Sequence, residues 1–81
     1  MRFSQNTVKV MGFINEGDII AKISHNAKMS IQGVNLIIKE MEHRGMIIRS
    51  PGKRERPIKI TEKGMVFKGI CREAWDMWQE K

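Results

Sequence analysis

Residues 29–64 read MSIQGVNLIIKEMEHRGMIIRSPGKRERPIKITEKG, and this stretch decides the fold. It begins with Ser30, whose hydroxyl can cap a helix, and apolar residues follow at spacings of four and three. Gly45 is a typical helix stop. Two short apolar runs, 46–50 and 58–60, then flank the turn signal Pro51-Gly52, which is typical of a hairpin. The segment therefore predicts a helix followed by a two-stranded hairpin.

The residues on either side predict three further helices. Ser4 or Asn6 can cap a first helix that ends near Gly17, and Asp18 can cap a short second helix that breaks at 27–29. After the hairpin, Thr61 can cap a long last helix that runs toward Lys81. We therefore expect one α+β, mostly α-helical domain over residues 1–81, with a three-helix core, a hairpin and a long C-terminal helix.

The positive charge is concentrated in one part of the chain. The formal net charge is +6, and residues 44–68 hold eight Lys or Arg side chains against two acids, which accounts for all of that excess. Such a cluster attracts a polyanion and gains free energy when phosphates displace their counterions. A solubilising surface is the alternative, so the charge alone does not decide the partner.

Several classes of function find no support in the sequence. A single cysteine and two distant histidines, His25 and His43, do not form a metal-binding pattern, and there is no nucleophile motif or phosphate-binding glycine loop. No apolar run approaches the roughly 20 residues that a membrane helix needs. We therefore expect a cytoplasmic protein that is not an enzyme and that uses no cofactor.

The segment from Ile23 to Gly64 resembles the DNA-binding core of MarR-type winged helix-turn-helix transcription regulators. The matching residues lie in register along the helices, and they are Ile23-Ser24, Met29-Ser30, Val34, Ile38, Met41-Glu42, Gly45-Met46-Ile47 and Thr61-Glu62-Lys63-Gly64. The chain departs from the family pattern at one position and in one segment: Gly33 stands where Thr or Ser is usual, and Lys53-Arg54-Glu55-Arg56 replaces an Asp-Arg-Arg signature. The resemblance implies a winged-helix fold and binding to double-stranded DNA, with regulation of transcription as the role.

This resemblance implies two sets of DNA contacts. A recognition helix presents its N-terminal part to base edges in the major groove, while cations on the hairpin, called the wing, bind phosphates or the minor groove. The recognition-helix candidates are Ser30, Ile31, Gln32, Gly33, Asn35, Leu36 and Lys39. The wing and backbone candidates are Lys28, Arg49, Lys53, Arg54, Arg56 and Lys59. Gln32 and Asn35 suit adenine, and an ordinary solvated helix face is the alternative for both.

The last helix predicts self-association. Its apolar half continues through two tryptophans beyond the length that the hairpin can cover, and a large exposed apolar patch usually marks an interface. We expect a homodimer that binds a palindromic DNA site, with last helices packed together and the first helix contributing. The interface candidates are Val10, Phe13, Cys71, Ala74, Trp75 and Trp78. The alternative is that the last helix folds back over its own domain.

Two other roles remain open at this stage. Winged-helix domains also serve as protein-interaction modules, although these usually lose the basic wing that this chain retains. A DNA replication or partition initiator would show the same sequence features as a transcription regulator.

Overall fold

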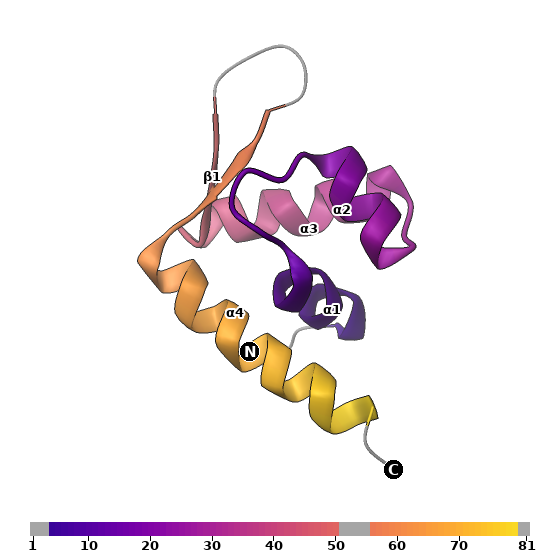
Figure 1. Cartoon of the computed structure of the whole chain (residues 1–81). Coiled ribbons are helices and arrows are strands. Elements are labelled where there is room, and N and C mark those ends of the chain that lie inside the picture. Colours follow the sequence, from indigo (N-terminus) through magenta and orange to yellow (C-terminus); the bar gives the residue numbers. More distant parts are fainter. Residues whose placement is uncertain (1–3, 51–55, 80–81) are drawn as a thin grey trace.

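The structure is a computed structural model that describes residues 4–50 and 56–79. Four helices and a two-stranded sheet follow one another in the predicted order (Figure 1). The elements are α1 (Gln5–Phe13), α2 (Ile20–Ala27), α3 (Ile31–His43), β1 (Ile47–Arg49), β2 (Ile58–Ile60) and α4 (Glu62–Gln79). The predicted mostly helical α+β class is confirmed.

Hydroxyl side chains cap three of the helices at their N-termini, as the sequence predicts. Ser4 caps α1, Ser30 accepts a hydrogen bond from the backbone N–H of Gly33 at 3.0 Å, and Thr61 accepts one from Gly64 at 3.1 Å. Each bond satisfies a helix N–H that has no partner within its own helix. These caps therefore fix where α1, α3 and α4 begin.

The prediction that Asp18 caps α2 is wrong. Ile19 occupies the cap position and provides no side-chain hydrogen bond, while Asp18 lies buried one residue earlier. Its carboxylate accepts a hydrogen bond from the backbone N–H of Asn15 at 2.9 Å and lies 3.4 Å from the ammonium of Lys22. Asp18 therefore stabilises the loop between α1 and α2.

Pairing with the hairpin explains why Asp18 stays in that loop. The N–H of Gly17 donates to the carbonyl of Ile58 at 2.9 Å, and the N–H of Ile58 donates to the carbonyl of Asp18 at 2.9 Å. The loop thus adds hydrogen bonds to the outer edge of β2, whose other edge pairs antiparallel with β1. Ile58 is consequently held from both sides and is fully buried.

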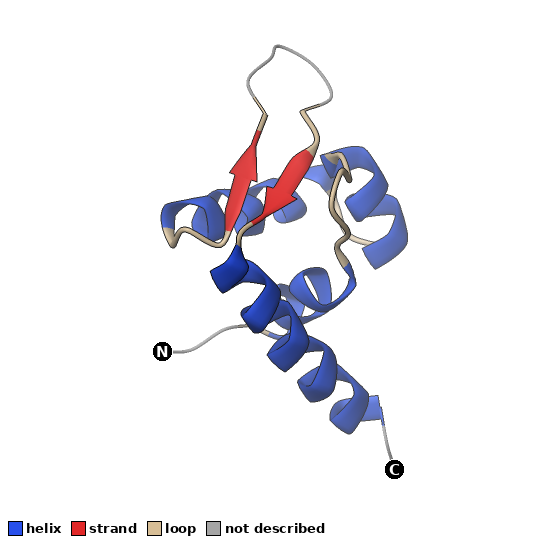
Figure 2. Ribbon diagram, turned by 60° about the vertical axis from the view of Figure 1, so that its left-hand side comes forward, coloured by secondary structure: helices blue, strands red, loops and turns tan. Residues whose placement is uncertain are grey.

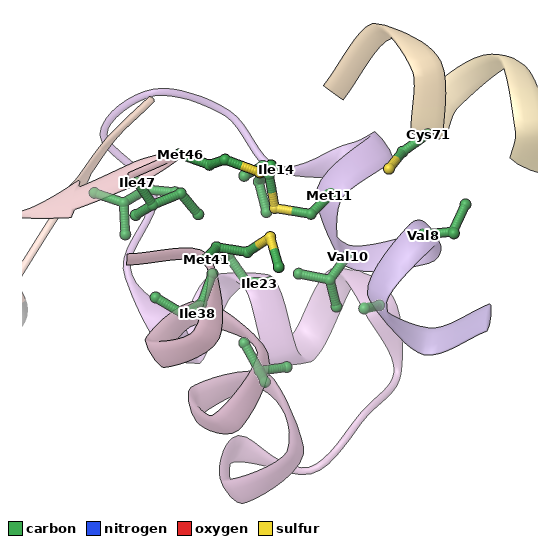
Figure 3. Close-up of a cluster of buried hydrophobic side chains, with 13 residues drawn as sticks. Val8, Val10, Met11, Ile14, Ile23, Ile38, Met41, Met46, Ile47 and Cys71 are labelled. Atoms are coloured by element: carbon green, nitrogen blue, oxygen red, sulfur yellow. The ribbon is translucent and has the colours of Figure 1, made fainter. Parts of the chain in front are cut away.

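The core lies between α1 and the other helices. Val10, Met11 and Ile14 are at most 1% exposed and lie among side chains from α2, α3 and the hairpin (Figure 3). Cys71 enters the same cluster from α4. Gly12 allows α1 and α4 to approach closely, because a Cβ atom there would lie 3.3 Å from the backbone nitrogen of Arg72. Apolar burial on this scale is the main stabilising contribution to the fold.

The start of α4 is attached to the end of α3. Thr61 donates its hydroxyl proton to the carbonyl of Gly45 at 2.7 Å, and the ammonium of Lys63 donates to the carbonyl of Arg44 at 2.9 Å. The backbone N–H of Thr61 also donates to the carbonyl of Met46 at 3.0 Å. These bonds satisfy carbonyl groups at the end of α3 and fix the direction of α4, which runs away from the hairpin (Figure 2).

Candidate nucleic-acid interface

A tight turn places the N-terminus of α3 at the surface. Lys28 adopts a left-handed conformation with φ of 55°, and the hydroxyl of Ser24 donates to the carbonyl of Met29. The α2 side chains Ile23 and Ala27 are buried in the core, so α2 supports α3 from one side. Lys28 itself is exposed beside the start of α3.

The outer face of α3 is exposed in the described part of the chain. Val34, Ile38 and Met41 face the core and are fully buried. The opposite face carries exposed side chains, among them Gln32, Leu36 and Lys39, and Ile31 is exposed at the start of the helix. Leu36 is 69% exposed, so it does not complete the core. This mixture of apolar, amide and cationic side chains is suited to base edges in a major groove.

Gly33 lies at the first turn of α3, beside the cap. A Cβ atom at this position would lie 3.1 Å from the hydroxyl oxygen of Ser30 and 3.6 Å from the methyl group of Met29. Because glycine has no side chain, the capping hydroxyl keeps its place and the backbone of the first turn stays uncovered.

The guanidinium of Arg49 is paired with side chains of α3. Its Nε and Nη2 atoms lie 2.8 and 2.7 Å from a carboxylate oxygen of Glu42, and its Nη1 donates to the amide oxygen of Asn35 at 3.1 Å. Only 9% of the Arg49 side chain is exposed. The predicted backbone contact by Arg49 stays a prediction, and within the fold the charge of Arg49 is paired with Glu42, which belongs to the Met41-Glu42 match.

The hairpin presents further cations. Arg56 and Lys59 are exposed, and Lys59 lies opposite Ile48 in the register of the two strands. The predicted contacts Lys53 and Arg54 lie outside the described residues. These two exposed cations therefore lie on the hairpin, and Lys59 shares the sheet face of Ile48, opposite to the face from which Arg49 contacts α3.

The interface residues predicted on α1 and α4 divide into two groups. Val10 and Cys71 are buried within the chain itself, so their assignment to a surface between two copies is corrected. Both side chains are buried because α4 packs along α1 of the same chain, which is the alternative arrangement predicted for the last helix. Burial also raises the pKa of the Cys71 thiol from 9.0 to about 11.

The second group forms an aromatic cluster at the end of the α1–α4 contact. The ring of Phe13 meets Trp75 edge to face with centroids 6.2 Å apart, and Trp75 meets Trp78 at 6.3 Å. The guanidinium of Arg72 lies 4.5 Å from the Phe13 ring. Phe13 and Trp78 remain exposed, whereas Ala74 and Trp75 are half-buried.

An exposed apolar row lies on α4 beside this cluster. Val66, Ile70 and Met77 are each more than half exposed and occur at spacings of four and seven, so they share one side of the helix. Glu73 is the charged residue at the same side. We call Val66, Ile70 and Met77 the apolar row. The packing of α4 on α1 leaves these three side chains exposed.

Neither a metal centre nor a membrane span is found in the described part of the chain. Residues 4–50 and 56–79 contain no group of three or more His, Cys, Asp or Glu side chains arranged to hold a metal ion. None of the helices described there is both long and apolar enough to cross a membrane.

Comparison with solved structures identifies the architecture. AF1382 from Archaeoglobus fulgidus is similar over 98% of this chain and 93% of its own, with a TM-score of 0.80 and 20% identity. Lactococcus lactis ZitR, solved in complex with DNA, is similar over 95% of this chain and 56% of its own, with a TM-score of 0.78 and 16% identity. The chain has the winged helix-turn-helix fold. In this fold, α2 and α3 form the helix-turn-helix, and the hairpin of β1 and β2 is the wing.

The likeness extends to MarR-family proteins. The MarR family transcriptional regulator SPO1453 from Silicibacter pomeroyi is similar over 93% of this chain, with a TM-score of 0.76 and 14% identity. This chain spans just over half the length of SPO1453 and of ZitR, 56% in both cases. No family model and no curated protein matches the sequence. The predicted likeness to the core of MarR-type regulators is therefore confirmed at the level of the fold.

Proposed function

We propose that this protein binds double-stranded DNA as a homodimer and regulates transcription, acting as a repressor at palindromic sites. The proposal rests mainly on the exposure of the outer face of α3. The capped N-terminus of this helix and the basic wing belong to the same region of the fold. ZitR, which has the same fold, was solved in complex with DNA. The protein is accordingly a binding protein of the cytoplasm and not an enzyme.

In this proposal α3 is the recognition helix. Gln32 lies in its first turn and can pair with adenine through two hydrogen bonds, while Leu36 can contact the methyl group of thymine. Ser30 and the N-terminal N–H groups, together with Lys28, are placed to bind phosphates at the groove edge. Lys39 extends the face of Gln32 and Leu36 along the helix, and Ile31 adds an exposed apolar side chain at the helix start. Gly33 leaves the backbone of the first turn open to a close approach.

The wing supplies contacts that do not depend on sequence. Arg56 and Lys59 are exposed, and the proposal extends to Lys53 and Arg54, which lie outside the described residues. Each cation that neutralises a phosphate contributes about one unit to the slope of log affinity against log salt concentration. A role in the minor groove would instead depend on the flanking sequence.

The proposed dimer uses the apolar row together with Trp78 and Phe13. Val66, Ile70, Met77 and Trp78 are each at least half exposed; the first three share one side of α4, and Trp78 lies on a neighbouring side with the aromatic cluster. Large contiguous apolar patches on soluble domains usually mark interfaces, and a two-fold axis is the commonest symmetry for a self-complementary patch. Two copies related in this way can place their recognition helices about 34 Å apart, which is one turn of DNA.

Selection of bound sequences from a random DNA pool tests the DNA-binding proposal, and a palindromic enriched motif is the expected result. On that motif, Arg56→Ala and Lys59→Ala should each reduce the salt slope by about one unit. Arg72→Gln is the matched control, because it removes a charge from α4 away from the wing and should leave the slope unchanged. Absence of any enriched motif, with binding that is equal on all DNA, would contradict sequence-specific regulation.

Sedimentation of paired α4 variants tests the dimer. Ile70→Lys places a charge in the apolar row and should give a monomer with a retained circular dichroism spectrum. Met65→Lys is the control, since Met65 is equally exposed but lies on a different side of the same helix, and this variant should remain dimeric. A wild-type chain that stays monomeric at high micromolar concentration would refute the proposal.

A further inference from the structure

The contact between Asn35 and Arg49 has a consequence for which base Asn35 can read. Asn35 lies on α3 at the side that faces β1, and the Nη1 atom of Arg49 donates to its amide oxygen at 3.1 Å. A guanidinium carries only hydrogen-bond donors. The amide atom that faces Arg49 must therefore be the oxygen, which fixes the orientation of the whole amide.

Glu42 holds Arg49 in this position. Two guanidinium nitrogens, Nε and Nη2, lie within 2.8 Å of the same carboxylate oxygen, so Arg49 has little freedom to turn away from Asn35. The low exposure of the Arg49 side chain adds to this rigidity. Arg49 thus acts as a positioning residue that links the recognition helix to the first strand of the wing.

The amino group of Asn35 is the end of the amide that remains available. It makes no hydrogen bond to the described residues, and it is not among their buried polar atoms that lack a partner, so solvent reaches it. Bidentate pairing with adenine needs the amide oxygen and nitrogen side by side at the base edge. Here Arg49 occupies one of the two lone pairs of the oxygen, whereas both N–H donors of the amino group are unused by the described residues, so the amide is better prepared to donate than to accept.

We infer that Asn35 reads guanine, as a hydrogen-bond donor to N7 and O6, and that Arg49 sets this preference without contacting DNA. Guanine presents two adjacent acceptors in the major groove, whereas adenine presents an acceptor and a donor, and its N6 amino group opposes the amino group of Asn35. This inference rests on the proposed function and replaces the adenine preference that the sequence predicts for Asn35. The adenine preference proposed for Gln32 is unaffected.

Sequence selection with wild-type protein and three variants tests the inference. Asn35→Ala should flatten one position of the enriched motif, and that position should be guanine in the wild type, with a loss of about tenfold in affinity on the preferred site. Arg49→Met should allow adenine at the same position while leaving the salt slope unchanged. Asn35→Asp keeps the contact with Arg49 but has no amino group, so it should lose the guanine preference with the fold intact.

The outcomes separate the inference from the proposed function. Adenine at the position that depends on Asn35, or a salt slope reduced by about one unit in Arg49→Met, would overturn the inference alone, because the latter is the signature of a phosphate contact. If Arg49→Met fails to fold, Asn35→Asp still decides the point through the identity of the selected base. Failure of the wild-type chain to enrich any sequence would overturn the proposed function and this inference with it.

Discussion

Replacement of Gly64 by alanine tests how closely the start of α4 is seated on the wing. A Cβ atom at this position would lie 2.0 Å from the carbonyl oxygen of Met46 and 2.8 Å from the Cγ2 atom of Ile60. Because the carbonyl belongs to the backbone, it must retreat by more than 1 Å to reach an ordinary contact distance near 3.4 Å. Its hydrogen bond from the N–H of Thr61 is then lost or lengthened.

The expected change in the free energy of unfolding combines two destabilising contributions and one stabilising contribution. Overpacking costs about 1–3 kcal/mol, and loss of the hydrogen bond costs about 0.5–1.5 kcal/mol. The higher helix propensity of alanine offsets up to about 1 kcal/mol of this. We therefore expect Gly64→Ala to lower the free energy of unfolding by about 2 kcal/mol, or the melting temperature by roughly 8–16 °C for a domain of this size.

Gly69→Ala is the matched control for this prediction. Gly69 lies five residues further along the same helix, and a Cβ atom there would meet nothing within 4 Å. This variant should be more stable than wild type by up to about 1 kcal/mol. Urea unfolding followed by far-UV circular dichroism measures both variants. Equal stability of the two alanine variants would show that α4 is not seated against Met46 as described.

Two further predictions concern buried side chains. Asp18→Ala should lower the free energy of urea unfolding by about 1–3 kcal/mol, because the N–H of Asn15 loses its acceptor; Lys22→Ala removes only the exposed partner and should cost less than about 1 kcal/mol. Because burial raises the pKa of Cys71 from 9.0 to about 11, a thiol reagent should modify the native chain far more slowly than the unfolded chain. As pH rises, the thiol ionises in the unfolded chain before it ionises in the folded chain. The contribution of Cys71 to the free energy of unfolding is therefore complete below pH 9 and is lost between pH 9 and about 11. A native chain that reacts as fast as the unfolded one would contradict the burial of Cys71.

The elements that the sequence predicts well are those defined by short-range signals. The Ser30 cap, the buried spacing of α3 and the left-handed Gly45 all lie within one helix and its ends. The same holds for Thr61 and the start of α4. Local backbone chemistry alone therefore suffices to place α3, the wing and α4.

The residues whose contacts the sequence does not reveal are those whose partners lie in a different element of the fold. Asp18 has the right residue type for a cap, but pairing of its backbone with Ile58 holds it outside α2. Arg49 has the charge that a phosphate contact needs, but Glu42, seven residues earlier, lies within reach only after β1 folds back beside α3. Nothing in the spacing of the residues reveals such tertiary contacts.

The joint between α3 and α4 relates the two proposed surfaces to each other. The hydroxyl of Thr61 and the ammonium of Lys63 bind carbonyl groups at the end of α3, and Gly64 permits contact with the backbone at Met46. Helix α4 then extends away from the wing (Figures 1 and 2). In the proposed dimer, a change in the angle at this joint moves each recognition helix relative to the two-fold axis. The spacing between the two recognition helices therefore depends on the packing of Gly64 as well as on the apolar row.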